Sequence, residues 1–348
     1  MKILKLLLYP FAALYNLVMR FRNYLYDIGH KPSFQFNTAV VAVGNLTVGG
    51  SGKTPMIEYL IQLLKAKYGV ATLSRGYKRD TKGYRKAQRT DTARSLGDEP
   101  FQLFRKFGDE INVFVGEDRA FAIPHILQES PQTDVILLDD ALQHRSVKPQ
   151  VTILVTEYSN PFYRDFVLPF GRLREARVGA SRSDLVVVTK CNPATMPAQK
   201  DEMTSQINRY AGPKPIFFSC VEYDSPRSIG AHQTLSKNVI LVSGIAKTQP
   251  LTEYCFSNYN VLKHFKFPDH HRYSRKDLAM IESFCKSQTF PFSIITTEKD
   301  MVKLIAPEFK QFLDQWSWFY MPIRQVFLQD GLKFDALIFA AVTPAVKN

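Results

Sequence analysis

The residues with the clearest capacity for chemistry lie in a glycine-rich segment, Val43 to Thr54, of sequence VGNLTVGGSGKT. A β-branched run precedes this segment and a stretch with helical spacing of apolar residues follows it, as a phosphate-binding loop requires. Glycines at such a turn let successive backbone N–H groups point at phosphate oxygens. The segment therefore predicts a nucleotide-binding loop in which Lys53 reaches the β- and γ-phosphates and the Thr54 hydroxyl binds magnesium. The residues expected to contact the nucleotide are Thr47, Gly49, Gly50, Ser51, Gly52, Lys53 and Thr54.

Thr47 departs from the common spacing GxxxxGK(S/T), which has glycine at its position. The neighbouring Gly49 and Gly50 are expected to supply the flexibility that this glycine would give. The alternative interpretation is a glycine-rich turn with a chance Lys-Thr pair. Strand, loop and helix in register favour the nucleotide loop.

A second acidic motif supports this interpretation. The run VILLDD ends in Asp139 and Asp140 about ninety residues after the loop. A strand that ends in an acid is the expected partner that holds magnesium in nucleotide-hydrolysing proteins. Either Asp139 or Asp140 can be the magnesium residue, and the sequence leaves the choice open.

Other polar segments follow predicted strands. A basic stretch from Arg75 to Arg89 carries Tyr77 and suits anionic lipid heads or a substrate phosphate, although a solvated loop is an equal alternative. In the motif GDEP, Asp98 is either a helix N-cap or a base that accepts the proton of an attacking hydroxyl. Taken alone, the residue favours the cap.

Three more motifs lie further along the chain: DDALQHR from Asp139, PFGRLRE from Pro169 and FPDHHRY from Phe267. The arginines of the second suit the stabilisation of phosphoryl charge. In the third, a histidine paired with a carboxylate is a better interpretation than a metal site, because nothing completes a ligand set. TTEKD, from Thr296, lies at the end of a predicted strand. It either forms a structural turn or makes a base or hinge contact.

The elements that must position these motifs alternate between β-branched runs and helical stretches, which predicts an α/β fold with a parallel sheet. Residues 55–67 are expected to form the crossover helix after the first strand. Open parallel sheets bind ligands at the carboxyl ends of their strands, where the motifs lie. A boundary near residue 220 divides a kinase-type domain, 31–220, from a smaller α/β domain, 221–348, that contributes to the active-site cleft. The predicted strands begin at Thr38, Gly69, Asp134, Val151, Asp184, Pro215, Asn238 and Phe292.

Composition narrows the class of protein. Hydrophobic residues make up 45% and charged residues 22%, which disfavours a disordered chain and a polytopic membrane protein. The 45 Lys and Arg against 32 Asp and Glu give a formal charge of +13, which favours a polyanionic partner without choosing among phosphate, membrane and nucleic acid. The four cysteines are widely spaced, which indicates neither a zinc site nor a disulfide framework and fits a reducing cytoplasm.

Residues 1–30 predict an amphipathic helix. The apolar run from Leu6 to Met19 is interrupted by Pro10 and is shorter than the roughly 20 residues that span a bilayer. Polar residues from Asn16 to Asp27 fall on one helical face and leave a broad apolar face. The pattern favours a helix lying in the membrane interface, with packing on the protein's own domain as the alternative.

Taken in order, VGNLTVGGSGKTP, SRGY, GDEP, DDALQHR, PFGRLRE, FPDHHRY and TTEKDMVKL resemble the tetraacyldisaccharide 4'-kinase family. The resemblance spans about Val43 to Leu304. It implies transfer of the γ-phosphoryl group of ATP to the 4'-hydroxyl of a tetraacylated glucosamine disaccharide 1-phosphate, a step of lipid A biosynthesis. It further implies a P-loop domain plus a second α/β domain, ATP and Mg²⁺ as cofactors, and work at the cytoplasmic face of a Gram-negative inner membrane.

The resemblance also implies roles for single residues. Asp98 becomes the general base in preference to a cap, and a histidine mapped to His270 orients it, with His271 one residue away as the open alternative. Glu175 joins Thr54, Asp139 and Asp140 near the metal. The residues implied to contact the substrate are Arg75, Tyr77, Arg119, Gln143, His144 and Arg172.

A rival from another class is a membrane-associated P-loop ATPase switch with no lipid acceptor. It explains the loop, the charge and the first helix, but leaves GDEP and FPDHHRY without a role. Nucleic-acid binding rests on charge alone and is not expected, because no nucleic-acid motif is present. The oligomeric state, acyl-chain preference and adenine contacts do not follow from the sequence.

Overall fold

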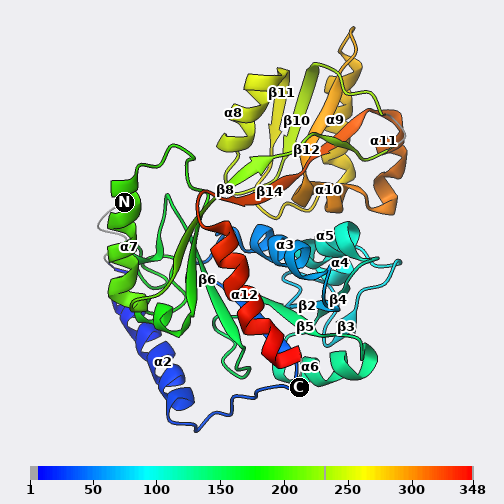
Figure 1. Cartoon of the computed structure of the whole chain (residues 1–348). Helices are drawn as coiled ribbons and strands as arrows, with labels where there is room; N and C mark the ends of the chain where they lie inside the picture. Colours follow the sequence, from blue (N-terminus) through cyan, green and yellow to red (C-terminus); the bar gives the residue numbers. More distant parts are fainter. Residues whose placement is uncertain (1–6, 231–232, 347–348) are drawn as a thin grey trace.

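Two α/β bodies make up the chain (Figure 1). The structure is a computed structural model that describes residues 7–230 and 233–346. The larger body is built on a nine-stranded sheet and the smaller on a five-stranded sheet. This arrangement confirms the predicted α/β class with a large parallel sheet.

The larger sheet is parallel from β8 to β4 and antiparallel only at its two edges. Its middle strands are rich in Val, Leu, Ile and Ala and are buried almost throughout, as expected for strands covered on both faces. In spatial order the strands are β14 (Ile323–Phe327), β8 (Ile216–Tyr223), β7 (Leu185–Thr189), β6 (Val151–Glu157), β1 (Ala39–Gly44), β5 (Val135–Asp139), β2 (Val70–Ser74), β4 (Asn112–Val115) and β3 (Arg85–Lys86).

β1 occupies the centre of this sheet, between β5 and β6. Its residue Val43 is in register with Asp139 of β5. The glycine-rich loop and the acidic strand end therefore leave the same edge of the sheet side by side. The helices of this body are α2 (Tyr9–Asp27), α3 (Lys53–Leu64), α4 (Ala93–Leu96), α5 (Asp98–Phe107), α6 (Arg119–Glu129), α7 (Pro197–Ala211) and α12 (Gly331–Val346).

The smaller sheet follows the order β11 (Asn260–Lys266), β10 (Asn238–Ser243), β12 (Ser293–Thr297), β13 (Trp318–Met321) and β9 (Arg227–Ser228). Only β9 runs antiparallel to its neighbour. The sheet is accompanied by α8 (Gln249–Asn258), α9 (Arg275–Lys286), α10 (Glu298–Leu304) and α11 (Lys310–Gln315).

The chain crosses between the bodies twice. β8 leads out of the larger body, and β14 returns beside it in an antiparallel pair. The final helix, α12, then lies against the larger body (Figure 1). Its residues Phe334, Ile338 and Val342 pack into the same core cluster as Val41 of β1. The domain limits 31–220 and 221–348 remain a prediction. In the structure, β14 and α12 pack with the larger sheet.

A buried ion-pair cluster joins the bodies next to the site. Lys106 of α5 lies with its Nζ 2.7 Å from Glu58 Oε2 of α3 and 3.0 Å from Glu298 Oε1 of α10. Both carboxylate side chains are only 5% exposed. Burial, and then the charge of Glu298, raise the pKa of Glu58 to about 7, while Lys106 opposes the shift.

Lys106→Met is expected to lower the free energy of unfolding by about 3–5 kcal/mol, because it leaves two buried carboxylates facing each other without a cation. Urea denaturation measures the change. Lys286→Met is the matched control: its exposed pair with Glu282 is worth about 1 kcal/mol or less. Equal stability of the two variants would show that the bridge contributes nothing.

Candidate active site

The glycine-rich loop turns from β1 directly into α3. Gly49 and Gly52 have φ of 107° and 91°, conformations that L side chains rarely adopt. Gly52 is the N-cap of α3, so the first free N–H groups of the helix open onto the loop. This geometry is suited to an anion, and nucleotide contact by the residues from Thr47 to Thr54 remains a prediction.

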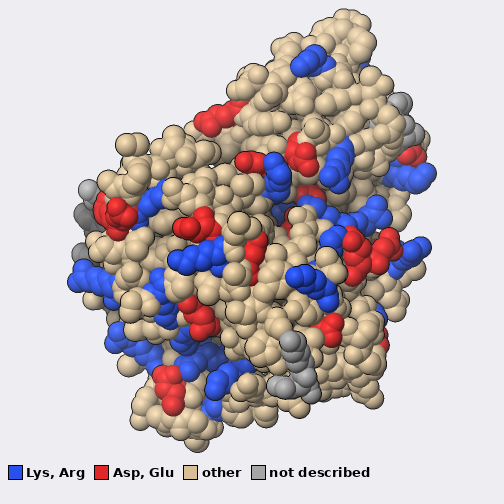
Figure 2. Space-filling view, viewed as in Figure 1, with Lys and Arg blue, Asp and Glu red and all other residues tan. Residues whose placement is uncertain are grey.

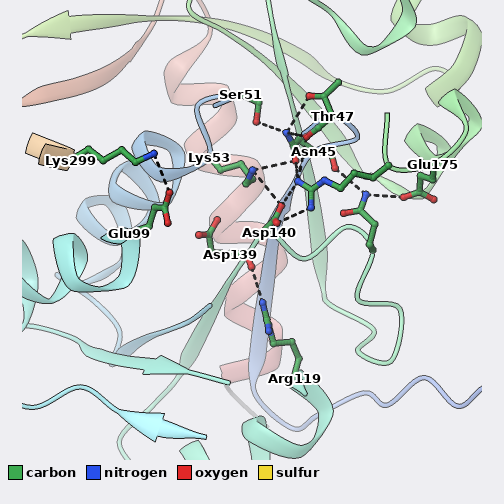
Figure 3. Close-up of polar contacts among 12 residues, drawn as sticks. Asn45, Thr47, Ser51, Lys53, Glu99, Arg119, Asp139, Asp140, Glu175 and Lys299 are labelled. Carbon is green, nitrogen blue, oxygen red and sulfur yellow. Dashed lines mark hydrogen bonds and ion pairs between the residues drawn. The ribbon is translucent and has the colours of Figure 1, made fainter. Parts of the chain in front are cut away.

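Asn45, which is not among the predicted site residues, holds the loop together (Figure 3). Its Nδ2 donates to the Thr47 carbonyl at 2.7 Å and to Ser51 Oγ at 2.7 Å. Its Oδ1 accepts from Lys53 Nζ at 3.3 Å and from Arg174 at 2.5 Å. Its place inside VGNLTVGG was the only sequence signal for this role.

The two acids after β5 have different surroundings. Asp140 takes a bidentate contact from Arg174, at 2.7 and 2.8 Å, and lies 3.3 Å from Lys53 Nζ. Burial alone would raise the pKa of Asp140, but Lys53 and Arg174 outweigh burial and hold that pKa far below its usual value. Asp140 is therefore a fixed negative charge that orients two cations.

Asp139 is 8% exposed, and its Oδ1 has no hydrogen-bond partner among the described residues. Burial raises the pKa of Asp139 to about 6, with Lys53 acting against the shift and the charges of Asp140 and Glu99 adding to it. A buried carboxylate oxygen without a partner needs a cation or water to compensate its desolvation. It fits a hard cation that keeps several waters and phosphate oxygens, as Mg²⁺ does.

Protein side chains alone do not enclose a metal here. Within residues 7–230 and 233–346, no group of three or more His, Cys, Asp or Glu lies together as a metal cluster. Glu175, expected near the metal, has both carboxylate oxygens in hydrogen bonds: Oε2 accepts from Asn23 and Oε1 accepts from Gln143 and Arg182. A metal role for Glu175 remains a prediction that requires these bonds to change.

Asp98 and His270 meet across the two bodies. His270 Nδ1 lies 3.2 Å from Asp98 Oδ2, and both side chains are 19% exposed. The N-cap of α5 is Gly97, so Asp98 occupies the first turn without acting as the cap. His271 instead contacts Asp277, at 3.1 Å, so the structure places His270 beside Asp98.

Glycines allow Asp98 to reach this position. Gly76 and Gly97 both have positive φ and approach so closely that a Cβ on Gly97 would lie 3.1 Å from the Gly76 backbone. The close approach brings Tyr77 to the same site, where its ring makes an edge contact with His270 at a centroid distance of 5.6 Å. The charge of Glu99, the next residue of α5, contributes to the raised pKa of Asp139.

The residues predicted to bind substrate do not share one environment. Arg75 and Tyr77 are exposed. Arg172 is half-exposed and pairs with Asp165 at 2.8 Å, while its backbone carbonyl accepts from Val48 N–H at 2.8 Å and so ties PFGRLRE to the loop. These hydrogen bonds and exposures do not test whether the residues contact the substrate, so that role stays a prediction.

Arg119, Gln143 and His144 are more enclosed. Arg119 is fully buried and donates to the carbonyls of Gly116 and Glu117. It also donates to the Asp139 carbonyl at 3.4 Å (Figure 3). Burial, and then the charge of Arg119, lower the pKa of His144 to about 4, so this ring is neutral at pH 7. In this arrangement Arg119 holds the backbone at the end of β5 through its bond to the Asp139 carbonyl.

The polar face of α2 packs on the site. Asn23 Nδ2 donates to Glu175 at 2.8 Å, Arg22 donates to the Gln143 carbonyl at 2.8 Å, and Asp27 pairs with Arg145 at 2.6 Å. The opposite face is apolar and open to solvent. The large side chains of α2 that are at least 55% exposed are Tyr9, Phe11, Leu14, Leu17, Val18, Phe21 and Tyr24.

Basic side chains gather over and beside α2 on the surface (Figure 2). Across the described residues, no helix has both the length and the apolarity to cross a membrane. Residues 1–6, which are part of the predicted amphipathic helix, lie outside the residues that the structure describes.

Comparisons with known proteins agree on one family. The model of the family described as "Tetraacyldisaccharide-1-P 4'-kinase" matches residues 4–343. A tetraacyldisaccharide 4'-kinase of Flavobacterium johnsoniae is 42% identical over 97% of both chains, and one of Flavobacterium psychrophilum is 39% identical over the full length of both. The crystal structure of LpxK from Aquifex aeolicus in complex with ATP superimposes with a TM-score of 0.75 and 27% identity over 97% of this chain and 99% of that one. The chain belongs to the tetraacyldisaccharide-1-P 4'-kinase family.

Proposed function

We propose that the chain transfers the γ-phosphoryl group of ATP to the 4'-hydroxyl of a tetraacylated disaccharide 1-phosphate by means of Asp98, with the nucleotide held on the loop from Thr47 to Thr54. Its membership of the family makes it a kinase of lipid A biosynthesis. The observation that carries the residue assignment is the Asp98–His270 contact across the two bodies.

In the proposed reaction, Asp98 accepts the proton of the sugar hydroxyl while the hydroxyl oxygen bonds to the γ-phosphorus of ATP. The bond between the γ-phosphorus and the oxygen that leaves with ADP breaks. A carboxylate close to an imidazole is suitable for this role because the ring orients it. Lys53 offsets the charge that develops on the transferring group. Asp140 and Asn45 support this step by holding the Lys53 ammonium in place.

Magnesium suits the same site. When bound, Mg²⁺ supplies charge neutralisation at the β- and γ-phosphate oxygens. The residues that would hold it are Thr54 and Asp139, and Asp139 has the buried carboxylate oxygen that lacks a partner among the described residues.

The pKa of Asp139 predicts a pH dependence of magnesium binding. Because that pKa is raised to about 6, the carboxyl must lose its proton before it can ligate Mg²⁺. Apparent Mg²⁺ affinity in the ATP complex is expected to be constant above pH 7 and to fall about tenfold per unit below pH 6. Titration of Mg²⁺ at several pH values checks this. Asp139→Asn should reduce the dependence to the part that comes from protonation of the ATP phosphate, whose pKa is also about 6. A dependence that is unchanged in Asp139→Asn would assign it to a group other than Asp139.

Membrane contact is proposed for the apolar face of α2, on the cytoplasmic side of the inner membrane. The face is exposed although the helix is anchored through its polar side, and basic side chains lie nearby (Figure 2). Such a surface is suited to the interface of an anionic bilayer. It would bring the site to a lipid substrate.

Substituting Phe11, Leu14 and Phe21 together by Ser is expected to weaken vesicle binding by more than roughly 100-fold, since each buried side chain contributes about 1.5–3 kcal/mol. Sedimentation with anionic vesicles measures the effect. Leu332→Ser, at an 87% exposed position on α12, is the control and should leave binding unchanged. A triple variant that sediments as completely as the wild type would exclude α2 as the anchor.

Transfer to lipid distinguishes the kinase from an ATPase switch. With labelled ATP and a panel of glycolipids, the label is expected in the tetraacylated disaccharide 1-phosphate. Label released only as inorganic phosphate would support the switch.

A further inference from the structure

Lys299, the second residue of α10, lies at the junction of the two bodies. Its Nζ is 3.1 Å from His270 Nε2 and 3.2 Å from Asp269 Oδ1 of the smaller body. It is also 3.6 Å from Glu99 Oε1 of the larger body (Figure 3). We propose that Lys299 is a positioning residue that fixes His270 in the tautomer with its proton on Nδ1, and through His270 orients Asp98. The inference rests on the proposed role of Asp98.

The tautomer follows from the kinds of atoms in contact. A lysine ammonium has three donors and no acceptor, so His270 Nε2 must accept from Lys299. A neutral imidazole carries one proton, which is then on Nδ1. Nδ1 is the nitrogen that lies 3.2 Å from Asp98 Oδ2, so it donates to that carboxylate.

Carboxylates from both bodies hold the ammonium in place. Asp269 Oδ1 accepts from Lys299 and also from the backbone N–H of His270, at 3.1 Å. His270 itself has a φ of 57°, so the backbone of the loop adopts the left-handed conformation at this histidine. Glu99 is the neighbour of Asp98 on α5. Lys299 therefore aligns the histidine of one body with the carboxylate of the other.

This arrangement separates the roles of the pair. The His270 bond occupies Asp98 Oδ2. In the proposed reaction Oδ1 is the oxygen that takes the proton of the incoming hydroxyl. With Nε2 in contact with Lys299 and Nδ1 in contact with Asp98, both ring nitrogens have partners, and His270 serves to orient the base.

The direct test is ¹⁵N NMR of the full-length protein labelled at histidine, without substrate, at a pH at which the ring is neutral. The chain has seven histidines, and His270→Gln identifies the signals of His270 by their loss. We expect a protonated Nδ1 and an unprotonated Nε2 in the wild type. In Lys299→Met only the bond to Asp98 still holds the Nδ1 proton, so the fraction of the ring that is protonated on Nε2 should rise.

Lys276→Met, at an exposed position of α9, is the matched control and should leave both the His270 signals and the turnover unchanged. In kinase assays Lys299→Met should lower kcat by roughly 10- to 100-fold with KM for ATP changed less than about twofold. Glu99→Gln should keep the tautomer, because it leaves the contact of Lys299 with the ring intact.

A wild-type ring protonated on Nε2, or a Lys299→Met spectrum identical to the wild type, would overturn the proposal. The wild-type spectrum decides even if Lys299→Met does not fold. Since it needs no substrate, failure of the tautomer assignment is distinguishable from failure of the proposed kinase reaction.

Discussion

Asp98→Asn is expected to lower kcat for phosphoryl transfer by roughly 10²- to 10⁴-fold, the usual contribution of a general base. The amide keeps the size of the side chain but cannot take the proton of the sugar hydroxyl. The affinity for ATP should stay within about twofold, because Asp98 faces His270 and the loop contacts of the nucleotide are unchanged. Steady-state kinetics and equilibrium nucleotide binding measure the two quantities.

Asp277→Asn is the matched control for this substitution. Asp277 is also a carboxylate in contact with a histidine, since its Oδ2 lies 3.1 Å from His271 Nε2, but it is the N3 residue of the capping box of α9, whose N-cap is Ser274. Its loss should change stability and leave kcat within about threefold. Near-normal turnover of Asp98→Asn would refute the assignment of the base.

Lys53→Met should lower kcat by about 10³-fold, since it removes a cation aimed at the charge that develops on the transferring group. Lys53 also acts against the raised pKa of Asp139, so its loss should raise that pKa above about 6. More of Asp139 is then protonated at neutral pH, and the Mg²⁺ requirement should increase. Kinetics at varied Mg²⁺ and pH would show both effects.

Lys286→Met serves as the control for Lys53→Met, because its ammonium pairs only at the exposed surface of α9. If Lys53→Met retained full activity with an unchanged Mg²⁺ requirement, another cation would have to serve the phosphate. Arg174, which is bidentate to Asp140, is the residue to examine in that case.

Local patterns predicted the elements that carry the loop. The β-branched runs from Thr38 and Asp134 form β1 and β5, and the residues after Gly52 form α3. These features depend on neighbours in the sequence, and glycine is needed where φ is positive. The acidic strand end meets the loop because adjacent parallel strands end at one edge.

Contacts between distant segments could not be predicted in the same way. The pairing of β14 with β8 and the packing of α12 on β1 bring the end of the chain back to the larger body. Nothing in the local pattern of either element specifies its partner. The sequence predicts a second domain after residue 220. The return of the chain to the larger body depends on tertiary contacts, which the local pattern does not contain.

The site shows the same limit at single residues. His270 and His271 are adjacent and chemically alike, and only the turn at φ 57° directs the first toward Asp98. Lys299 was visible in TTEKD as part of a turn, whereas its contact with His270 depends on how the β12–α10 corner meets the loop. Arg119 was expected at the substrate, and its burial beneath Asp139 follows from the packing of α6.

The most direct test of the central claim is to determine which atom of the acceptor carries the transferred phosphate. The purified chain is incubated with Mg²⁺, ATP and the tetraacylated disaccharide 1-phosphate, and the product is analysed by ¹H–³¹P correlation NMR. The account predicts a second phosphate on the 4'-oxygen of the distal glucosamine, formed by the wild type and lost in Asp98→Asn. A phosphate on any other oxygen, or a product formed equally by Asp98→Asn, would contradict it.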